Sequence, residues 1–171
     1  MASFPLSRLS CLVLLALSAM AAQAAQPPDN VSVHYRNPAH FTEAKRSFGV
    51  NANDADAYLK PLKAYIAQRA ARILASGQRL DVEVTDVDLA GEYEPWRGPD
   101  FNNVRIVKDI YPPRIDLDFT LYGADGKVLR SGSRSLRDLA FMARASAVDQ
   151  DSLRYEKALI DRWLRKGAAG L

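Results

Sequence analysis

The chain has 171 residues, and its 23 Lys and Arg against 20 Asp and Glu give a net charge of +3 at pH 7. Nucleic-acid binding usually shows a concentrated basic excess, and no such excess is present, so this class of function is not expected. No tandem repeat or low-complexity run is found, which argues against a repeat protein.

Residues 1–25 are predicted to be an export signal that is cleaved off. Arg8 supplies its positive start, 12-LVLLALSAMAA-22 its apolar run, and Ala22-Gln23-Ala24 its small-x-small cleavage pattern. The apolar run is shorter than the roughly 20 residues that cross a bilayer, so no membrane span is expected in the mature form. Cys11, the single cysteine, is expected to leave with the signal. The mature chain would then have no disulfide, cysteine nucleophile or thiolate metal site.

Removing this signal leaves 171 − 25 = 146 residues, a common size for one domain. Residues 26–30 are expected to be a flexible leader, and residues 31–171 a single domain. Without Arg8, 22 basic residues face 20 acidic ones, a net charge of +2. An exported domain without disulfides has to be held together by its apolar core.

The first half of the mature chain predicts a strand, a loop and a helix. Residues 31–35 alternate apolar and polar side chains, as a half-buried strand does. Residues 37–53 show no period and are predicted to be a long loop. Residues 54–77 carry an apolar stripe at helical spacing and end at a glycine. Pro61 conflicts with an unbroken helix, which either begins at Pro61 or is kinked there.

The middle of the chain predicts strands separated by a loop. Residues 80–84 alternate as a strand, and the apolar positions then change phase at Val87, which requires a bulge near Thr85-Asp86. Residues 91–103 are rich in glycine, proline and asparagine and are predicted to be a loop. Residues 104–110 suggest a third strand.

Residues 114–121 alternate most regularly and predict a strand that returns through a tight turn. Leu121 and Leu129 are expected to share one side of the sheet, which requires the three-residue loop 124–126. Gly126 is then expected in the left-handed backbone conformation, which glycine adopts at little cost.

This register also predicts which side chains face each other on the hairpin. It places Asp116 beside Arg134 and Thr120 beside Arg130, and opposite charges across a strand pair are favourable. The carboxylates of this strand then belong to a salt-bridged face rather than to a catalytic pair. The serines of 131-SGSRS-135 are expected to face inward, as small residues where a helix meets the sheet.

Residues 151–167 predict a last helix, with Gly167 at its end. The elements together indicate an α+β fold: a mostly antiparallel four- or five-stranded sheet with two helices packed on one face. Their order is β-α-β-β-β-β-α. The first two strands, joined through the first helix, can form a parallel pair by a right-handed crossover.

Glu156 falls within the apolar stripe of the last helix, one turn before Ile160. A carboxylate in such a place must find a donor or shift its pKa. A buried ion pair with an arginine such as Arg105 or Arg114 is the favoured interpretation. The alternative is a functional carboxylate.

Asp86, Asp88 and Gly91 stand at positions 1, 3 and 6 of an EF-hand calcium loop. Position 5 is an alanine and position 12 an arginine, where the loop needs an oxygen donor and a bidentate glutamate. No metal site is therefore predicted. A looser cation site remains open, made by Asp86, Asp88, Glu92 and Glu94.

Catalytic patterns are scarce. His34 and His40 are the two histidines, and the chain has neither a Gly-x-Ser-x-Gly elbow nor a His-Glu-x-x-His pair. No glycine-rich loop joins a strand to a helix as a phosphate site would need. No catalytic residue and no cofactor is predicted.

Two loops, residues 92–101 and 108–114, carry aromatic side chains beside basic ones, the usual composition of interface hot spots. They either bind a ligand or partner, or their aromatic side chains fold back over one end of the sheet. The candidate binding residues are Tyr93, Trp96, Arg97, Lys108, Tyr111 and Arg114.

Three segments carry a resemblance: 81-DVEVTDVDLAG-91, 104-VRIVKDIYPPRIDLDF-119 and 152-SLRYEKALIDRW-163. Together they resemble an uncharacterised family of exported proteobacterial proteins, a domain of unknown function, over residues 31–163. The resemblance implies a location in the envelope of a Gram-negative bacterium, in the periplasm. It implies no activity and no site residue.

The expected function is that of a non-enzymatic periplasmic module that binds a partner protein or an envelope ligand. The absence of a catalytic pattern and the aromatic and basic loops favour it. The alternative is a small hydrolase or lyase that works through carboxylates such as Glu156 or Asp116. The sequence indicates neither the partner nor an oligomeric state.

Overall fold

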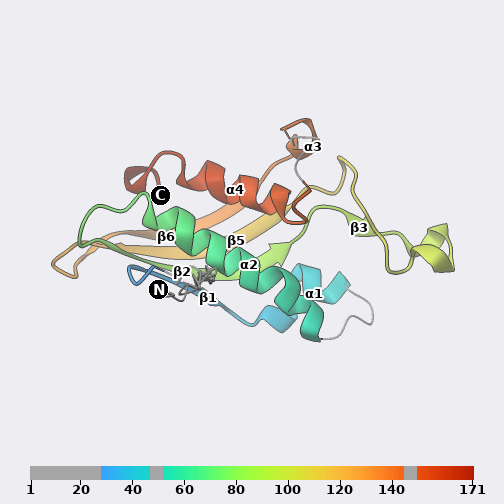
Figure 1. Cartoon of the computed structure of the whole chain (residues 1–171), viewed down its shortest axis with the longest axis horizontal. Helices are drawn as coiled ribbons and strands as arrows, with labels where there is room; N and C mark the ends of the chain where they lie inside the picture. Colours follow the sequence, from blue (N-terminus) through green and yellow to red (C-terminus); the bar gives the residue numbers. More distant parts are fainter. Residues whose placement is uncertain (1–27, 47–51, 145–149) are drawn as a thin grey trace, which may run out of the picture.

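The computed structural model of the protein describes residues 28–46, 52–144 and 150–171. The predicted export signal lies outside the described residues. The described chain is α+β, with a mixed four-stranded sheet that is mostly antiparallel and two long helices packed on one of its faces (Figure 1). This confirms the predicted fold class.

The sheet has the strand order β1-β2-β5-β6. Its strands are β1 (Val31–Tyr35), β2 (Arg79–Asp88), β5 (Arg114–Tyr122) and β6 (Val128–Arg137). β1 and β2 are parallel neighbours, and the other two pairs are antiparallel. The predicted parallel pair is therefore confirmed, with the long helix α2 in the connection between its strands.

Two long helices cover the sheet, α2 (Ala52–Ala71) and α4 (Arg154–Leu164). α2 runs through Pro61 and begins before it, so the interpretation that the helix begins at Pro61 is wrong. Two short helices, α1 (Thr42–Arg46) and α3 (Phe141–Arg144), were not predicted from the sequence. The 3-10 turns are Pro38–His40, Pro95–Arg97, Pro99–Phe101 and Ala168–Gly170.

The hydrophobic core lies between the sheet and the two long helices. Alternate residues of each inner strand point into it, and the buried side chains of β5 are Ile115, Leu117, Phe119 and Leu121. Leu62 and Ile66 of α2 and Ile160 of α4 close it from the other side. Burial of this apolar surface is the main force that holds the domain together.

β2 changes its register with β5 between Val84 and Asp86, as the phase change in the sequence predicted. The bulge keeps Val84 and Val87 buried although they are three residues apart. It also turns the end of β2 toward α1, and so places Asp86 beside that helix.

The β5–β6 hairpin confirms the turn and corrects the register. Gly126 has φ 76°, and Gly123 and Lys127 close the three-residue loop between them. However, a second bulge at Leu129 shifts the pairing by one residue, so that Leu121 faces Arg130. Leu129 is exposed instead of inward.

The shifted register exchanges the faces that the sequence predicted for the serines and arginines of β6. Ser133 and Ser135 lie on the open face, where their hydroxyls donate to Asp118 at 2.5 Å and to Asp116 at 2.6 Å. Arg134 turns to the helix-covered face and stacks on the ring of Phe119. Two serine–carboxylate hydrogen bonds replace the two predicted arginine contacts.

The third predicted strand does not join the main sheet. Its first residues form β4 (Arg105–Ile106), which pairs with β3 (Glu92–Tyr93) in a separate two-stranded ribbon. We call residues 91–111 the arm. Figure 1 shows its segment around β3 projecting beyond the end of the sheet.

Candidate functional site

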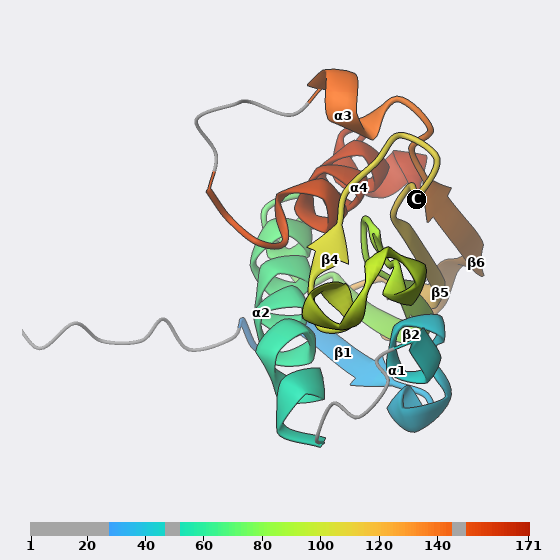
Figure 2. The same ribbon diagram turned by 90° about the vertical axis from the view of Figure 1, so that its right-hand side faces the viewer.

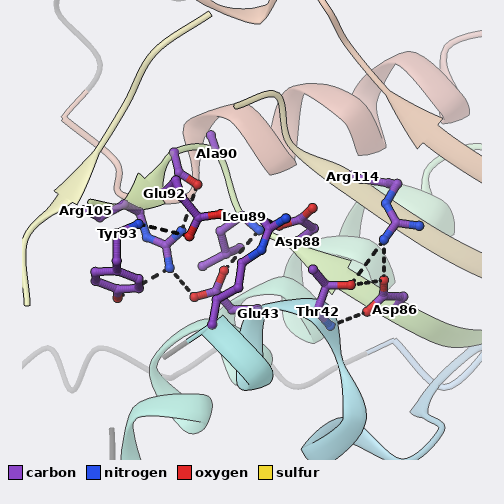
Figure 3. A network of polar contacts seen from close by, with 12 residues as sticks. Thr42, Glu43, Asp86, Asp88, Leu89, Ala90, Glu92, Tyr93, Arg105 and Arg114 are labelled. Atoms are coloured by element: carbon purple, nitrogen blue, oxygen red, sulfur yellow. Dashed lines mark hydrogen bonds and ion pairs between the residues drawn. The ribbon is translucent and has the colours of Figure 1, made fainter. Parts of the chain in front are cut away.

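Polar side chains gather where β2 ends, at the end of the sheet that carries α1 and the arm (Figure 3). Several of them are carboxylates that are largely shielded from water, and each needs a donor to lie there. We call this group the junction network: Thr42, Glu43, Arg46, Asp86, Asp88, Arg105, Arg114 and Glu156.

Asp86 joins the bulge of β2 to the first turn of α1. Its carboxylate accepts hydrogen bonds from the backbone N–H and the hydroxyl of Thr42, both at 2.6 Å. Arg114 donates to the same carboxylate at 2.6 Å and to Asp116 at 2.5 Å. A carboxylate at the start of a helix satisfies an N–H group that has no partner within the helix.

Arg46 joins the other end of α1 to β2 and the arm. Its guanidinium lies 2.7 Å from the carboxylate of Asp88 and 3.1 Å from that of Glu92. Burial raises the pKa of Asp88, and the nearby Arg46 partly opposes this.

The looser cation site is not formed. Asp86, Asp88, Glu92 and Glu94 are each bonded to an arginine or lysine of the protein. Within the described ranges, no group of three or more His, Cys, Asp or Glu side chains is placed to hold a metal ion.

Glu43 and Arg105 form the inner part of the junction network. The buried carboxylate of Glu43 is bonded to the guanidinium of Arg105 and accepts the N–H of Leu89 at 3.2 Å. Arg105 also stacks on the ring of Tyr93, 4.7 Å from its centre, and donates to the carbonyl of Gly91 at 3.3 Å. One arginine therefore ties α1 to both strands of the arm.

Glu156, the residue that α4 contributes to the junction network, is 1% exposed. One carboxyl oxygen accepts the backbone N–H of Ala90 at 2.7 Å, and the other is buried and has no hydrogen-bond partner among the described residues. Burial raises the pKa of Glu156. The expected partners are engaged elsewhere, Arg105 by Glu43 and Arg114 by Asp86 and Asp116, so a backbone donor takes the place of the predicted arginine.

Glu94 holds the arm together from within. Its carboxylate is shielded from water and lies 2.5 Å from both the Lys108 ammonium and the Arg97 guanidinium, and it accepts the Tyr111 hydroxyl at 3.0 Å. The hydrogen bond from Lys108, followed by those from Arg97 and Tyr111, lowers the pKa of Glu94 to about 2. The carboxylate is therefore ionised at any physiological pH, and its bonds to the two halves of the arm persist.

A cleft of about 910 Å³ lies between α1 and the arm. We call it the aromatic cleft; Figure 2 faces this end of the molecule. Trp96, on its rim, is 70% exposed. The cleft is lined by the rings of Tyr93, Pro95, Trp96 and Tyr111, and by the polar side chains of Lys45, Arg46, Glu92, Asn102 and Asn103.

The six binding candidates from the sequence divide into three groups. Tyr93, Trp96 and Tyr111 line the aromatic cleft. Arg97 and Lys108 bond to Glu94 within the arm, and Arg114 belongs to the junction network. With Trp96 largely in solvent, this aromatic side chain does not fold back over the sheet.

Sequence reasoning missed the residues that α1 contributes, Thr42, Glu43, Lys45 and Arg46, because their segment was predicted to be a loop. A signal was present: Glu, Ala, Lys and Arg all have high helix propensity. Five residues are too few to show a helical period. Glu94 was considered only as a loose metal ligand, and its three donors lie up to 17 residues away along the chain.

A second cleft, of about 420 Å³, lies where α2 and α4 end. The carboxylate of Asp161 lies 2.6 Å from the guanidinium of Arg69, so one of the arginines that line this cleft already has a partner. The remaining lining residues are Arg72, Ile73, Leu164 and Arg165. Positive side chains at helix C-termini also offset the helix dipole, so their presence alone does not indicate a ligand.

Residues 29–166 match the model of a protein family described as "Protein of unknown function (DUF3016)". The match confirms the resemblance to a family without an assigned activity. Comparisons with curated proteins and with solved structures gave no match. Among the described residues, no helix is both long and apolar enough to cross a membrane.

Proposed function

We propose that this chain, which belongs to the DUF3016 family, is an exported binding module of the cell envelope. It is directed to the periplasm of a Gram-negative bacterium by a cleaved signal in residues 1–25. There it binds a partner protein through the arm and the aromatic cleft, without catalysing a reaction.

The exposure of Trp96 carries this proposal. A tryptophan that is 70% exposed beside a cleft with two tyrosines is costly to keep in water unless something covers it. Tryptophan, tyrosine and arginine are the residues that most often dominate binding energy at protein interfaces.

The internal bonding of the arm supports the same reading. Glu94 with its three donors, and Arg105 with Tyr93 and Glu43, hold the arm in one arrangement before any partner arrives. Ordering a loop opposes binding, and a loop that is already ordered avoids that cost. Such an arm suits recognition better than a flexible loop would.

The test is recovery of partners from envelope extract with immobilised protein. Trp96→Ala is expected to abolish recovery of a specific partner. Leu139→Ala is the matched control, because Leu139 is 71% exposed on the segment after β6 and does not line the aromatic cleft. Equal recovery by wild type and Trp96→Ala would remove the cleft from the binding surface.

Export has its own test. Protein recovered from the periplasm is expected to begin at Ala25 or Gln26, and its mass should show that Cys11 is absent. A periplasmic form that retains Cys11 would contradict cleavage at the predicted site.

One observation favours the alternative, a small hydrolase or lyase. Glu156 is a buried carboxyl with a raised pKa and one unpartnered oxygen, properties that suit a general acid. Glu156 lines neither of the two clefts, however, so a substrate would have no route to it through them. Binding without catalysis is therefore the preferred function.

A further inference from the structure

We infer that the aromatic cleft binds a proline-containing, extended segment of the partner protein, with an acidic residue of that segment beside Lys45. This inference rests on the proposed function, that the cleft is a partner-binding surface. It adds the chemistry of what is bound.

The first step concerns the rings of the cleft. The hydroxyls of Tyr93 and Tyr111 are already engaged, by Arg105 at 3.4 Å and by Glu94 at 3.0 Å. These two side chains therefore offer a ligand ring surface rather than a hydroxyl, with one face of the Tyr93 ring covered by Arg105, and Trp96 and Pro95 add further apolar surface. Flat or compact apolar groups of a ligand, such as pyrrolidine rings, pack on such a surface.

The second step concerns the charged groups that are not free. Arg46 and Glu92, both in the lining, are bonded to each other at 3.1 Å, and Arg46 also bonds Asp88. The second oxygen of Glu92 accepts the N–H of Tyr93 at 3.0 Å. The carboxylate of the lining therefore already has one partner on each oxygen, so it attracts the donors of a ligand less than a free carboxylate would.

The third step concerns the polar groups that are free. Lys45 forms no ion pair with any described residue, and the exposed side chains of Trp96, Asn102 and Asn103 form no hydrogen bonds within the described part of the chain. Lysine and the indole N–H only donate, whereas each asparagine amide both donates and accepts. The free side chains therefore offer more donors than acceptors, which favours a ligand rich in acceptors.

A polyproline II segment has this chemistry. Its backbone carbonyls make no internal hydrogen bonds, its prolines have no N–H, and its extended form is already ordered before binding. Aromatic-lined grooves are a recurring way in which proteins recognise it. A volume of about 910 Å³ accommodates several residues rather than one side chain.

A carbohydrate of the envelope is the main competitor for an aromatic cleft. Sugars present hydroxyls that both donate and accept, and they are best held by acceptors and donors together. Here Glu92 and Arg46, the acceptor and the donor best suited to bind sugar hydroxyls, form an ion pair with each other. The ammonium of Lys45, which has no ion pair within the described residues, instead favours a negative group on the ligand, which a neutral glycan lacks.

Tryptophan fluorescence can test this directly. The chain has two tryptophans, Trp96 in the cleft and Trp163 in the core, so a ligand in the cleft changes the emission of Trp96 over a constant background. The probes are an acetylated oligoproline ending in glutamate, the same peptide ending in lysine, a glycine–serine peptide ending in glutamate, and a chitin oligosaccharide.

The acidic oligoproline is expected to bind best. Lys45→Glu should weaken its binding about threefold, as for one exposed ion pair, and should not weaken the lysine-ended peptide. Because Trp96→Ala removes the reporter, its affinity is measured by anisotropy of a dye-labelled peptide, with an expected loss of roughly tenfold or more. Leu139→Ala is expected to bind as wild type does.

Three results would overturn the inference: no binding of either oligoproline, equal binding of the glycine–serine peptide, or tighter binding of the oligosaccharide. None of these results removes the proposed function, which depends on recovery of a partner through Trp96. Conversely, a partner lost with Trp96→Ala but not displaced by excess acidic oligoproline would support the binding module and reject the proline segment.

Discussion

The helix-covered face of the sheet and the end that carries the arm are stabilised in different ways. On the covered face, apolar side chains from β2, β5, α2 and α4 are buried against each other, and shape and area decide the contact. At the other end, carboxylates such as Glu43, Glu94 and Glu156 are buried, and each is held by specific donors. In the first region a contact depends on the apolar surface that it buries, and in the second it depends on one particular donor being in place.

This difference bears on where function lies. A core of apolar residues is what any domain of this size needs. A set of buried carboxylates that fixes a projecting arm, with a tryptophan left in water beside it, serves no evident need of the core. The costly arrangement is the one we associate with binding.

The largest expected effect on stability comes from replacing isoleucine with alanine, and this substitution can be made in both regions. Ile160→Ala removes a fully buried side chain of the core and is expected to lower the free energy of unfolding by about 2–5 kcal/mol. Ile110→Ala removes the same atoms from a side chain in the arm that is 66% exposed, and should cost under about 0.5 kcal/mol. Denaturant melts measure both, and equal losses would mean that the arm is packed as the core is.

The next effect tests whether the arm depends on its charges. Arg105→Ala leaves the buried carboxylate of Glu43 without its guanidinium, which is expected to cost about 3 kcal/mol, the low end for a broken buried ion pair. The arm should also become more sensitive to proteolysis, because the Arg105 side chain, which projects from β4, contacts Gly91 and Tyr93 on the β3 side of the arm. Arg137→Ala, an exposed arginine on β6, is the control and should change neither property.

The same division explains how much could be predicted from the sequence. The strands of the sheet, the bulge before Asp86 and the two long helices follow from periodicity, because one face of each element is apolar. The register of the hairpin could not be predicted from that signal alone. The apolar pattern predicts that Leu129 faces inward, whereas the hydrogen bonds from Ser133 and Ser135 to the β5 carboxylates are satisfied when Leu129 bulges out.

The site was harder to predict than the fold. Tyr93, Trp96 and Tyr111 could be named as candidates from composition, and they do line one cleft. The partner of Arg105 could not be named, because Glu43 comes from a short helix with no periodic signal and lies 62 residues away along the chain. Polar contacts between distant segments leave no pattern in a single sequence.

A smaller effect tests the turn that closes the sheet. Gly126→Val places a branched side chain at φ 76°, where the backbone conformation itself costs about 1–2 kcal/mol. A Cβ atom at Gly126 would meet nothing within 4 Å, so the loss would be a backbone effect and not a clash. Ala124→Ser in the same loop should be nearly neutral. Equal melting temperatures for the two variants would contradict the role of the left-handed glycine.

The smallest expected effect is a pH dependence of folding stability that comes from Glu156 alone. Its raised pKa means that the folded protein keeps a proton that the unfolded chain releases near 4.5, so stability falls as pH rises through the interval between these two values. Glu156→Gln cannot ionise, and its amide oxygen can still accept the N–H of Ala90. The variant should therefore match wild type at low pH and become the more stable of the two as the pH rises.

Glu83→Gln is the matched control for this trend, and it should run in the opposite direction. The hydrogen bond from Arg36 lowers the pKa of the exposed Glu83. A carboxylate with a lowered pKa adds stability above its usual value and loses it as the pH falls. Glu83→Gln should thus be slightly less stable than wild type at neutral pH and equal to it at low pH. Urea melts of both variants between about pH 2.5 and pH 8 compare the two slopes, and parallel slopes would mean that Glu156 ionises as an ordinary surface carboxylate does.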